Sequence, residues 1–393
     1  MQQPQAVTIL GSTGSIGEST LAVIAQHPTR YTVAALVAKS QDARLAEQCL
    51  QFKPQVAVLE DESAAARLRE RLKPHVATEV WSGRDAVIQA AGSLGDVVMA
   101  AIVGGCGLQP TLAAARAGKR VLLANKEALV MSGPLLLDAV HQSGGVLLPI
   151  DSEHNAIFQC LPAGRAGQAR AGVKRLWLTA SGGPFLRTPF ATLTTVSPQQ
   201  AVAHPKWQMG AKISVDSATL VNKGLELIEA VLLFGMAPEH IRVVIHPESI
   251  VHSLVEYVDG STLAQMGNPD MRVPIAHALA YPKRIESGVA GLDLIAVGQL
   301  RFEAPDVERF PSLPLCIEAA RVGQSAPTVL NAANEVAVAA FLDHRLNFMG
   351  IPQVIDSVLS QVAVEPLTDV ETVLSLDRRA RALAAHWIEQ RFL

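Results

Sequence analysis

Two carboxylates stand one residue apart at the end of an apolar run. The run at 146–148 is typical of a buried strand, and Asp151 and Glu153 follow it. If the chain is still extended there, both side chains point to one side, because side chains alternate along a strand. Two like charges in one space need a cation or a shared proton between them. Carboxylate oxygens suit a hard divalent ion such as Mg²⁺ or Mn²⁺. A solvated acidic loop is the competing interpretation.

A second group of polar residues lies on the segment SATLVNKGLELIE, whose apolar spacing predicts a helix. Asp216 or Ser217 is the expected cap of that helix. Asn222, Lys223 and Glu226 are three or four residues apart and therefore lie along one side of it. The alternative is an ordinary Lys–Glu surface pair. In a metal site, Glu226 would supply a third oxygen ligand and Lys223 a cation for a phosphate.

Two further stretches carry candidate site residues. Ala124-Asn125-Lys126-Glu127 follows the apolar run at 120–123, one strand before Asp151, which favours Lys126 as an active-site cation over surface decoration. The small-residue loop SGGP, which begins at Ser181, offers N–H and hydroxyl groups to a phosphate. Trp207 stands in a polar loop and is either a core anchor or part of a lid.

The elements that would hold these residues begin with a nucleotide-binding pattern. An apolar strand at 6–10 is followed by the glycine-rich turn GSTGSIG at 11–17 and then by helical spacing. Glycines let the backbone approach a pyrophosphate, and the helix N-terminus adds free N–H groups. The spacing Gly-x-x-Gly-x-x-Gly therefore predicts dinucleotide binding.

The end of the second strand indicates which nicotinamide cofactor is used. NAD-binding chains usually carry an acidic residue there for the ribose hydroxyl. This chain has Lys39 and Ser40 instead, with Arg44 one turn further on and no acid before Asp42. These residues suit a 2′-phosphate and favour NADPH, against the alternative that Lys39 is a solvated surface lysine.

Strand-like runs continue to alternate with helical stretches through residue 150. The runs lie at 55–59, 75–80, 96–102, 120–123 and 145–150. Alternation of this kind predicts an α/β fold with a Rossmann-like, doubly wound parallel sheet, in which ligands bind beyond the carboxyl ends of the strands. The run at 176–179 and the segment at 243–258 predict strands of an α+β region. Helical spacing recurs at 318–322, 329–342, 351–359 and 376–392.

Composition excludes several classes of function. The 393 residues are 49% hydrophobic and 18% charged, which is a globular mixture, and the net charge of −3 gives no general attraction for nucleic acid. The four cysteines are widely spaced, as in a reduced cytosolic protein. No apolar run reaches the ~18 residues of a membrane helix, and the N-terminus does not read as a signal peptide. His246 and His252 are interpreted as structural rather than as ligands.

Several strings together resemble the 1-deoxy-D-xylulose 5-phosphate reductoisomerase family over nearly the whole chain. They are GSTGSIG at 11–17, ANKE at 124–127, DSEHNA at 151–156, SGGPF at 181–185, HPKWQMG at 204–210, KISVDSATLVNKGLELIEA at 212–230, NPDMRVPIAH at 268–277 and LNAANEVAVAAFL at 330–342. The resemblance implies an oxidoreductase of isoprenoid-precursor biosynthesis. Such an enzyme rearranges a ketose phosphate and reduces the product with NADPH, using Mg²⁺ or Mn²⁺, with Co²⁺ as a further candidate.

The resemblance also implies roles for individual residues. The metal ligands are expected at Asp151, Glu153 and Glu226. The substrate backbone is expected to contact Lys126, Ser152 and His204, with Lys126 and His204 taking part in catalysis. The substrate phosphate is expected at Ser181, Ser217, Asn222 and Lys223, and a mobile flap carries Trp207 and Met209. The cofactor contacts are expected at Thr13, Gly14, Ser15, Ile16, Lys39, Ser40, Asn125, Glu127 and Gly210.

The family pattern implies four regions. They are an NADPH-binding domain at 1–150, a catalytic domain at 151–290 with a flexible lid near 204–212, a linker at 291–311, and a helical domain at 312–393. The expected partners are a sugar phosphate and a second copy of the chain in a homodimer, without nucleic acid or membrane. The expected compartment is the cytoplasm.

Two other classes of protein compete with this interpretation. A phosphorylating semialdehyde dehydrogenase also opens with a Gly-x-x-Gly-x-x-Gly loop, but its chemistry needs a cysteine nucleophile beside a histidine. Cys106 and Cys160 are the candidates here, and neither has a histidine-bearing motif nearby in the sequence. An NADPH-sensing regulator, in which the carboxylates only stabilise a loop, is the non-enzymatic alternative.

Overall fold

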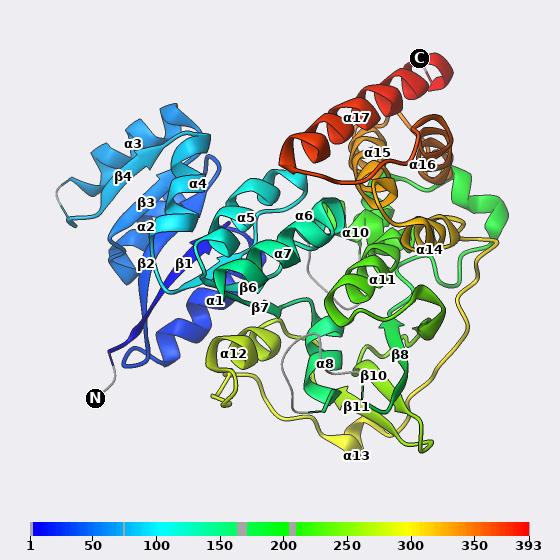
Figure 1. Cartoon of the computed structure of the whole chain (residues 1–393), viewed down its shortest axis with the longest axis horizontal. Coiled ribbons are helices and arrows are strands. Elements are labelled where there is room, and N and C mark those ends of the chain that lie inside the picture. The colour runs from blue at the N-terminus through cyan, green and yellow to red at the C-terminus, as the bar shows by residue number, and fades with distance from the viewer. Residues whose placement is uncertain (1–2, 74, 163–170, 204–209, 393) are drawn as a thin grey trace. The chain divides into compact units, whose positions relative to one another are not determined.

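The computed structural model describes residues 3–73, 75–162, 171–203 and 210–392 of the chain. These residues form two compact units (Figure 1). The first consists of Met1–Ala128, Leu136–Asn155 and Asp270–Ala290, and the second of Leu129–Leu135, Ala156–Pro269 and Gly291–Leu393. None of the described helices is both long and apolar enough to cross a membrane.

The first unit contains a seven-stranded parallel sheet in the order β4-β3-β2-β1-β5-β6-β7. Its inner strands are buried on both faces, which is why they appear in the sequence as continuous apolar runs. In chain order, the strands are β1 (Gln5–Leu10), β2 (Tyr31–Ala38), β3 (Val56–Leu59), β4 (Glu79–Ser82), β5 (Val97–Ala100), β6 (Arg120–Leu123) and β7 (Val146–Pro149).

Helices connect these strands and pack beside one another, α1 with α12, α2 with α3 and α4 with α5. They are α1 (Ser15–Gln26), α2 (Asp42–Phe52), α3 (Glu62–Leu72), α4 (Arg84–Ser93), η1 (Gly105–Gly107), α5 (Leu108–Arg116), α6 (Lys126–Ser132), α7 (Pro134–Ser143) and α12 (Arg272–Ala280). The strand order reverses between β1 and β5, so the chain winds outward in both directions from that point. The predicted doubly wound fold is confirmed. Its expected ligand crevice lies beyond the carboxyl ends of β1 and β5.

The second unit contains a four-stranded mixed sheet in the order β11-β10-β8-β9. Its strands are β8 (Val173–Ala180), β9 (Ile241–Ile245), β10 (Val251–Tyr257) and β11 (Thr262–Met266). Side chains of helices α8 (Ser152–Cys160) and α11 (Val221–Phe234) share an apolar cluster with this sheet, including Ile157, Leu227 and Leu178. One residue of each helix, Ile157 of α8 and Leu227 of α11, thus belongs to the same apolar cluster.

Helices form the remainder of the second unit, and their side chains build its largest core. They are η2 (Phe190–Thr195), α9 (Pro198–Val202), α10 (Ala211–Ala218), η3 (Pro238–His240), α13 (Leu294–Val297), α14 (Ser312–Val322), α15 (Ala326–Leu342), α16 (Gly350–Gln361) and α17 (Val370–Phe392). A Cβ added at Gly224 of α11 would lie 2.3 Å from Cys316 Sγ of α14, so these two helices pack at very close range. The C-terminal helices therefore support α11 directly.

Two predicted strands have different bounds in the structure. The run at 75–80 becomes strand only at Glu79, because the pairing of β4 with β3 begins at Val56. The segment at 243–258 is divided into β9 and β10. The interruption contains His246, whose Nδ1–H donates to the Arg301 carbonyl oxygen at 2.8 Å. Its Nε2 accepts the N–H groups of Ile250 and Val251, each at 3.1 Å, so this buried histidine organises a turn.

Candidate active site

The glycine-rich turn after β1 leads directly into α1. Gly11 has a φ of +81°, and a Cβ added there would lie 2.6 Å from the Ala101 carbonyl oxygen, so only glycine fits without displacement. A Cβ at Gly17 would lie 2.5 Å from the Gly11 oxygen. Gly14 is the N-cap of α1 and makes no side-chain capping bond, and it and Ser15 are exposed. The turn therefore presents backbone N–H groups at a helix N-terminus, which is how a pyrophosphate is bound.

The end of β2 presents positive charge to solvent. Lys39 and Ser40 are both exposed. Asp42, the first acid after β2, is engaged by Arg67 and Arg71, and their hydrogen bonds hold the pKa of its carboxyl below the usual range. Asp42 is thus paired with two arginines. Arg44 pairs with Glu18 of α1 at 2.6 Å, so it is fixed beside the glycine-rich turn.

The polar residues after β6 join two strand ends. Asn125 Nδ2 donates to the Gly104 carbonyl oxygen at 3.1 Å and to Glu127 Oε2 at 3.2 Å, while its Oδ1 accepts the Ala128 N–H at 2.9 Å. Lys126, which is 5% exposed, forms an ion pair with Asp151 after the neighbouring strand β7. Lys126 is therefore a buried cation beside a carboxylate and not surface decoration.

The condition that the chain is still extended at Asp151 and Glu153 is not met. Helix α8 begins at Ser152, and the Asn155 N–H donates to the Asp151 carbonyl oxygen at 2.9 Å to close its first turn. Asn155 Nδ2 also donates to the Pro149 carbonyl oxygen at 2.8 Å, which ties this turn to the end of β7. The strand ends sooner than expected because β7 pairs with β6 only as far as Pro149.

The single helix predicted from residue 217 is also wrong. The chain forms α10 and α11, and they are separated at Leu220, which has a left-handed φ of +62°. Asp216 and Ser217 belong to the last turn of α10 and do not cap α11. The Thr219 hydroxyl donates to the Val215 carbonyl oxygen at 3.0 Å within this break. The predicted helical spacing of Asn222, Lys223 and Glu226 is kept, because all three lie on α11.

On α11, the Glu226 carboxylate accepts hydrogen bonds from both Asn222 Nδ2 and Lys223 Nζ. Glu226 is 1% exposed and Lys223 3%. Removing an ion pair of this kind from water is costly unless its hydrogen bonds are satisfied. The ion pair between Lys223 and Glu226 is therefore buried in the protein interior and is not an ordinary surface pair.

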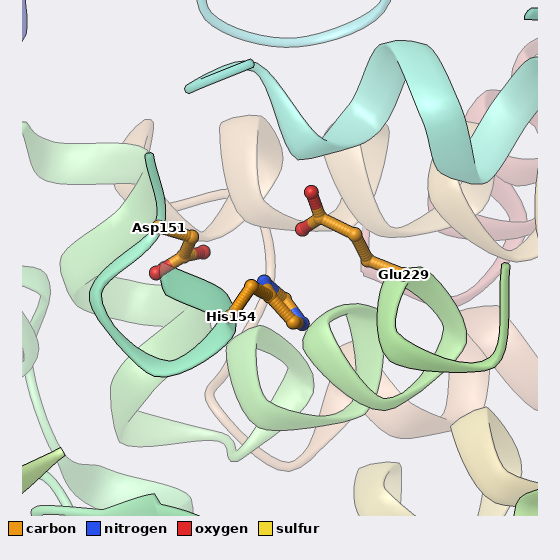
Figure 2. A group of neighbouring side chains, drawn as sticks. All are labelled: Asp151, His154 and Glu229. Atoms are coloured by element: carbon orange, nitrogen blue, oxygen red, sulfur yellow. The ribbon is translucent and has the colours of Figure 1, made fainter. Parts of the chain in front are cut away.

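The structure brings the three predicted metal-binding acids together. One ligand atom from each of Asp151, Glu153 and Glu226 lies within 4.8 Å of the others. A second group of the same kind shares Asp151 and adds His154 of α8 and Glu229 of α11 (Figure 2). Sequence reasoning missed His154 and Glu229. The sequence did contain a signal for these two residues, because each stands within three residues of a predicted acid on the same helix.

The Ser181 loop after β8 packs against the end of α10. Gly182 and Gly183 have φ values of +84° and +66°, and the Gly183 N–H donates to Ser181 Oγ at 3.2 Å. A Cβ at Gly183 would lie 2.9 Å from the Ser217 carbonyl oxygen. The structure thus places the Ser181 loop next to Ser217, and both were predicted to bind the substrate phosphate.

The remaining predicted residues lie in different parts of the chain. Ser152 donates to Glu153 through its hydroxyl, and Thr13 and Ile16 are half-buried in the glycine-rich turn. Gly210 is the exposed N-cap of α10. His204, Trp207 and Met209 lie outside the described residues. Burial lowers the pKa of His252 to about 4, and the charge of nearby Lys223 acts in the same direction, so this ring is neutral at pH 7.

A glycine-rich, dinucleotide-binding turn in a doubly wound sheet is typical of nicotinamide-dependent oxidoreductases. Grouped carboxylates beside buried lysines indicate that this oxidoreductase also depends on a metal ion. Comparison with known proteins defines the family. Residues 7–133 match the model described as 1-deoxy-D-xylulose 5-phosphate reductoisomerase, and residues 147–234 and 266–383 match two models of its C-terminal domain. The chain belongs to the 1-deoxy-D-xylulose 5-phosphate reductoisomerase family.

Relatives of that name cover nearly the full chain. The protein from Methylococcus capsulatus is 60% identical over 390 residues, which are 98% of this chain and 99% of the relative. The protein from Janthinobacterium sp. is also 60% identical, over 387 residues, with 98% and 99% covered. Among solved structures, the reductoisomerase from Zymomonas mobilis in complex with NADPH has a TM-score of 0.92 at 48% identity, covering 99% of this chain and 100% of that one. A reductoisomerase in complex with NADPH, fosmidomycin and magnesium has a TM-score of 0.91 at 48% identity, with 98% of each chain covered.

Proposed function

We propose that the carboxylates of Asp151, Glu153 and Glu226 and the lysines beside them form the catalytic centre of this chain. As a family member, the chain is an NADPH- and divalent-metal-dependent oxidoreductase of isoprenoid-precursor biosynthesis. It rearranges 1-deoxy-D-xylulose 5-phosphate and reduces the resulting aldehyde to 2-C-methyl-D-erythritol 4-phosphate. The observation that carries the proposal for the site is the grouping of three carboxylate ligand atoms within 4.8 Å of one another.

The donor set fits a hard divalent ion, because all three groups offer carboxylate oxygens. Asp151, Glu153 and Glu226 would hold it, with Mg²⁺ or Mn²⁺ favoured over Co²⁺. When bound, such an ion acts as a Lewis acid on the ketone and on the aldehyde derived from it. Lys126 and Lys223, which pair with Asp151 and Glu226, offset the repulsion between the carboxylates.

Other residues of the chain bind and orient the substrate. We assign the backbone of the sugar phosphate to Lys126, Ser152 and His204, and its phosphate to Ser181, Ser217, Asn222 and Lys223. The phosphate is remote from the reacting carbons, so its binding energy serves to position them. Trp207 and Met209, in the lid near 204–212, would exclude water when substrate is bound.

In this proposal, all cofactor contacts except Gly210 come from the first unit. The support for this assignment is the glycine-only backbone of the turn, since a side chain at Gly11 would collide with the backbone of Ala101 and one at Gly17 with the turn itself. Nine residues are assigned to the cofactor, namely Thr13, Gly14, Ser15, Ile16, Lys39, Ser40, Asn125, Glu127 and Gly210. NADPH supplies the hydride, and the chain orients the nicotinamide toward the aldehyde.

Replacing Lys39 by Glu is expected to reduce the preference for NADPH over NADH by about 10- to 100-fold, because a charge-assisted hydrogen bond contributes about 1.5–3 kcal/mol. Fluorescence titration with each cofactor measures the two dissociation constants. Lys53→Glu, at an exposed position after α2, is the matched charge reversal and should leave the ratio as in the native chain. An unchanged ratio in Lys39→Glu would assign Lys39 to the solvated surface.

The domain roles extend this assignment. We propose NADPH binding by 1–150, catalysis by 151–290, a linker at 291–311 and a bracing helical domain at 312–393. The family likeness favours a homodimer. Two observations support it, because β11 is an edge strand of its sheet with half-exposed Leu263, and Ile295 of α13 is 92% exposed. A cytoplasmic location is proposed from the spacing of the cysteines.

NADPH oxidation in the presence of 1-deoxy-D-xylulose 5-phosphate tests the function. Dialysis against a chelator should abolish turnover, and Mg²⁺ or Mn²⁺ should restore it. The double variant Cys106→Ser and Cys160→Ser should remain active, since burial raises the pKa of the Cys160 thiol to about 11 and disfavours its thiolate. Chelator-resistant activity that is lost with the cysteines would instead indicate a semialdehyde dehydrogenase, and NADPH binding without turnover would indicate a regulator.

A further inference from the structure

A buried carboxylate on α10 is bonded to the C-terminal helices. Asp216 is 1% exposed. Its Oδ2 forms an ion pair with Lys212 Nζ at 2.8 Å, one turn earlier on the same helix. Its Oδ1 accepts a hydrogen bond from Asn334 Nδ2 of α15, also at 2.8 Å, across 118 residues of sequence. These two bonds connect the carboxylate both to its own helix and to a distant helix.

Asn334 is fully buried. Its Oδ1 has no hydrogen-bond partner within the ranges that the structure describes. A buried amide with an unsatisfied acceptor costs stability, so an apolar side chain would serve packing better. A carboxylate can only accept, which means that the amide nitrogen must face Asp216. The bond to Asp216 is therefore the feature that accounts for asparagine at this position.

The last turn of α10 is where the proposed phosphate-binding stretches meet. Ser217 directly follows Asp216, and the Ser181 loop packs on the Ser217 carbonyl at Gly183. The left-handed turn at Leu220 then starts α11, which carries Lys223. A displacement of this turn would move all of these groups together.

We propose that Asp216 and Asn334 are positioning residues for the substrate phosphate. Their bond anchors the end of α10 to α15 and thereby sets the location of Ser217 and the Ser181 loop. The C-terminal helices thus determine affinity for the phosphorylated substrate without touching it. This inference rests on the phosphate site assigned under Proposed function.

Asn334→Ala is the direct test, and Asn331→Ala is its matched control. Asn331 is equally buried on the same helix, but its Nδ2 donates at 3.0 Å to Glu335 of α15 itself. Both variants remove the same atoms and should lower Tm to a similar extent. We expect Asn334→Ala to raise KM for 1-deoxy-D-xylulose 5-phosphate about tenfold, with kcat changed less than about threefold, because misplaced binding groups weaken positioning. The KM for NADPH should not change. Equal effects of the two variants on substrate KM would overturn the inference.

A double-mutant cycle with Ser217→Ala separates this inference from the function on which it rests. If Asn334 acts through the phosphate site, adding Asn334→Ala to Ser217→Ala should raise KM much less than it does alone. Additive effects would reject positioning. If Ser217→Ala by itself leaves KM unchanged, the phosphate assignment fails, and the inference fails with it. Should Asn334→Ala not fold, Asn334→Ser, whose hydroxyl is too short to reach Asp216, replaces it in the same cycle.

Discussion

Replacing Glu226 by Gln is expected to lower kcat by at least about 10³-fold, since loss of a Lewis acid removes several kcal/mol of transition-state stabilisation and each 1.36 kcal/mol is tenfold in rate. Glutamine keeps the shape of the side chain but removes the charge that attracts a divalent ion. It also leaves the buried Lys223 without the carboxylate that it now contacts. Asp151→Asn should act in the same way, because it removes another member of the same group of ligand atoms.

Binding measurements show whether the loss arises at the metal. Equilibrium dialysis with Mn²⁺ should show weakened binding in Glu226→Gln, while fluorescence titration should give the native affinity for NADPH. Glu239→Gln is the control, because Glu239 of η3 is exposed and pairs with Arg321 at 3.1 Å. That variant should retain full turnover. Metal-dependent activity at the native level in Glu226→Gln or Asp151→Asn would refute the ligand assignment.

Replacing Gly17 by Ala is expected to weaken NADPH binding about 100-fold, because a displacement of ~1 Å in a binding turn can have an effect of that size. The added Cβ would lie 2.5 Å from the Gly11 carbonyl oxygen, from the Ser12 Cα and from the Ser12 carbonyl oxygen. All three are backbone atoms, so no side-chain rotation relieves the contact and the turn must move away from α1. Overpacking of this kind also costs about 1–3 kcal/mol of stability, which thermal unfolding without cofactor would detect.

Gly14→Ala separates strain in the turn from obstruction of the cofactor. A Cβ at Gly14 meets only the Gly11 oxygen at 3.4 Å, and Gly14 has a φ of −85°. Its Tm without cofactor should therefore equal that of the native chain, and any loss of NADPH affinity would come from the methyl group facing the cofactor. A native affinity for NADPH in Gly17→Ala would contradict the proposed binding turn.

The local elements of the first unit could be predicted because each leaves a short-range signal. The strands buried on both faces appear as apolar runs, and the turn between β1 and α1 needs glycine for steric reasons that depend on nearby backbone. The sequence likewise shows that no acid precedes Asp42 after β2, and the structure adds that Asp42 is engaged by arginines. Errors arose where two elements meet. The change from β7 to α8 and the break at Leu220 depend on where strand pairing stops and where a helix packs.

The sequence by itself determined the residue types of the site, the class of fold and the family, because these depend on composition, short spacings and long matching strings. Only the tertiary structure decided which side chains meet. Ligand atoms of Glu226 and Asp151 lie within 4.8 Å of each other, and Asp216 meets Asn334 across 118 residues. Contacts of this length depend on the packing of whole helices, for which no local periodicity provides a signal.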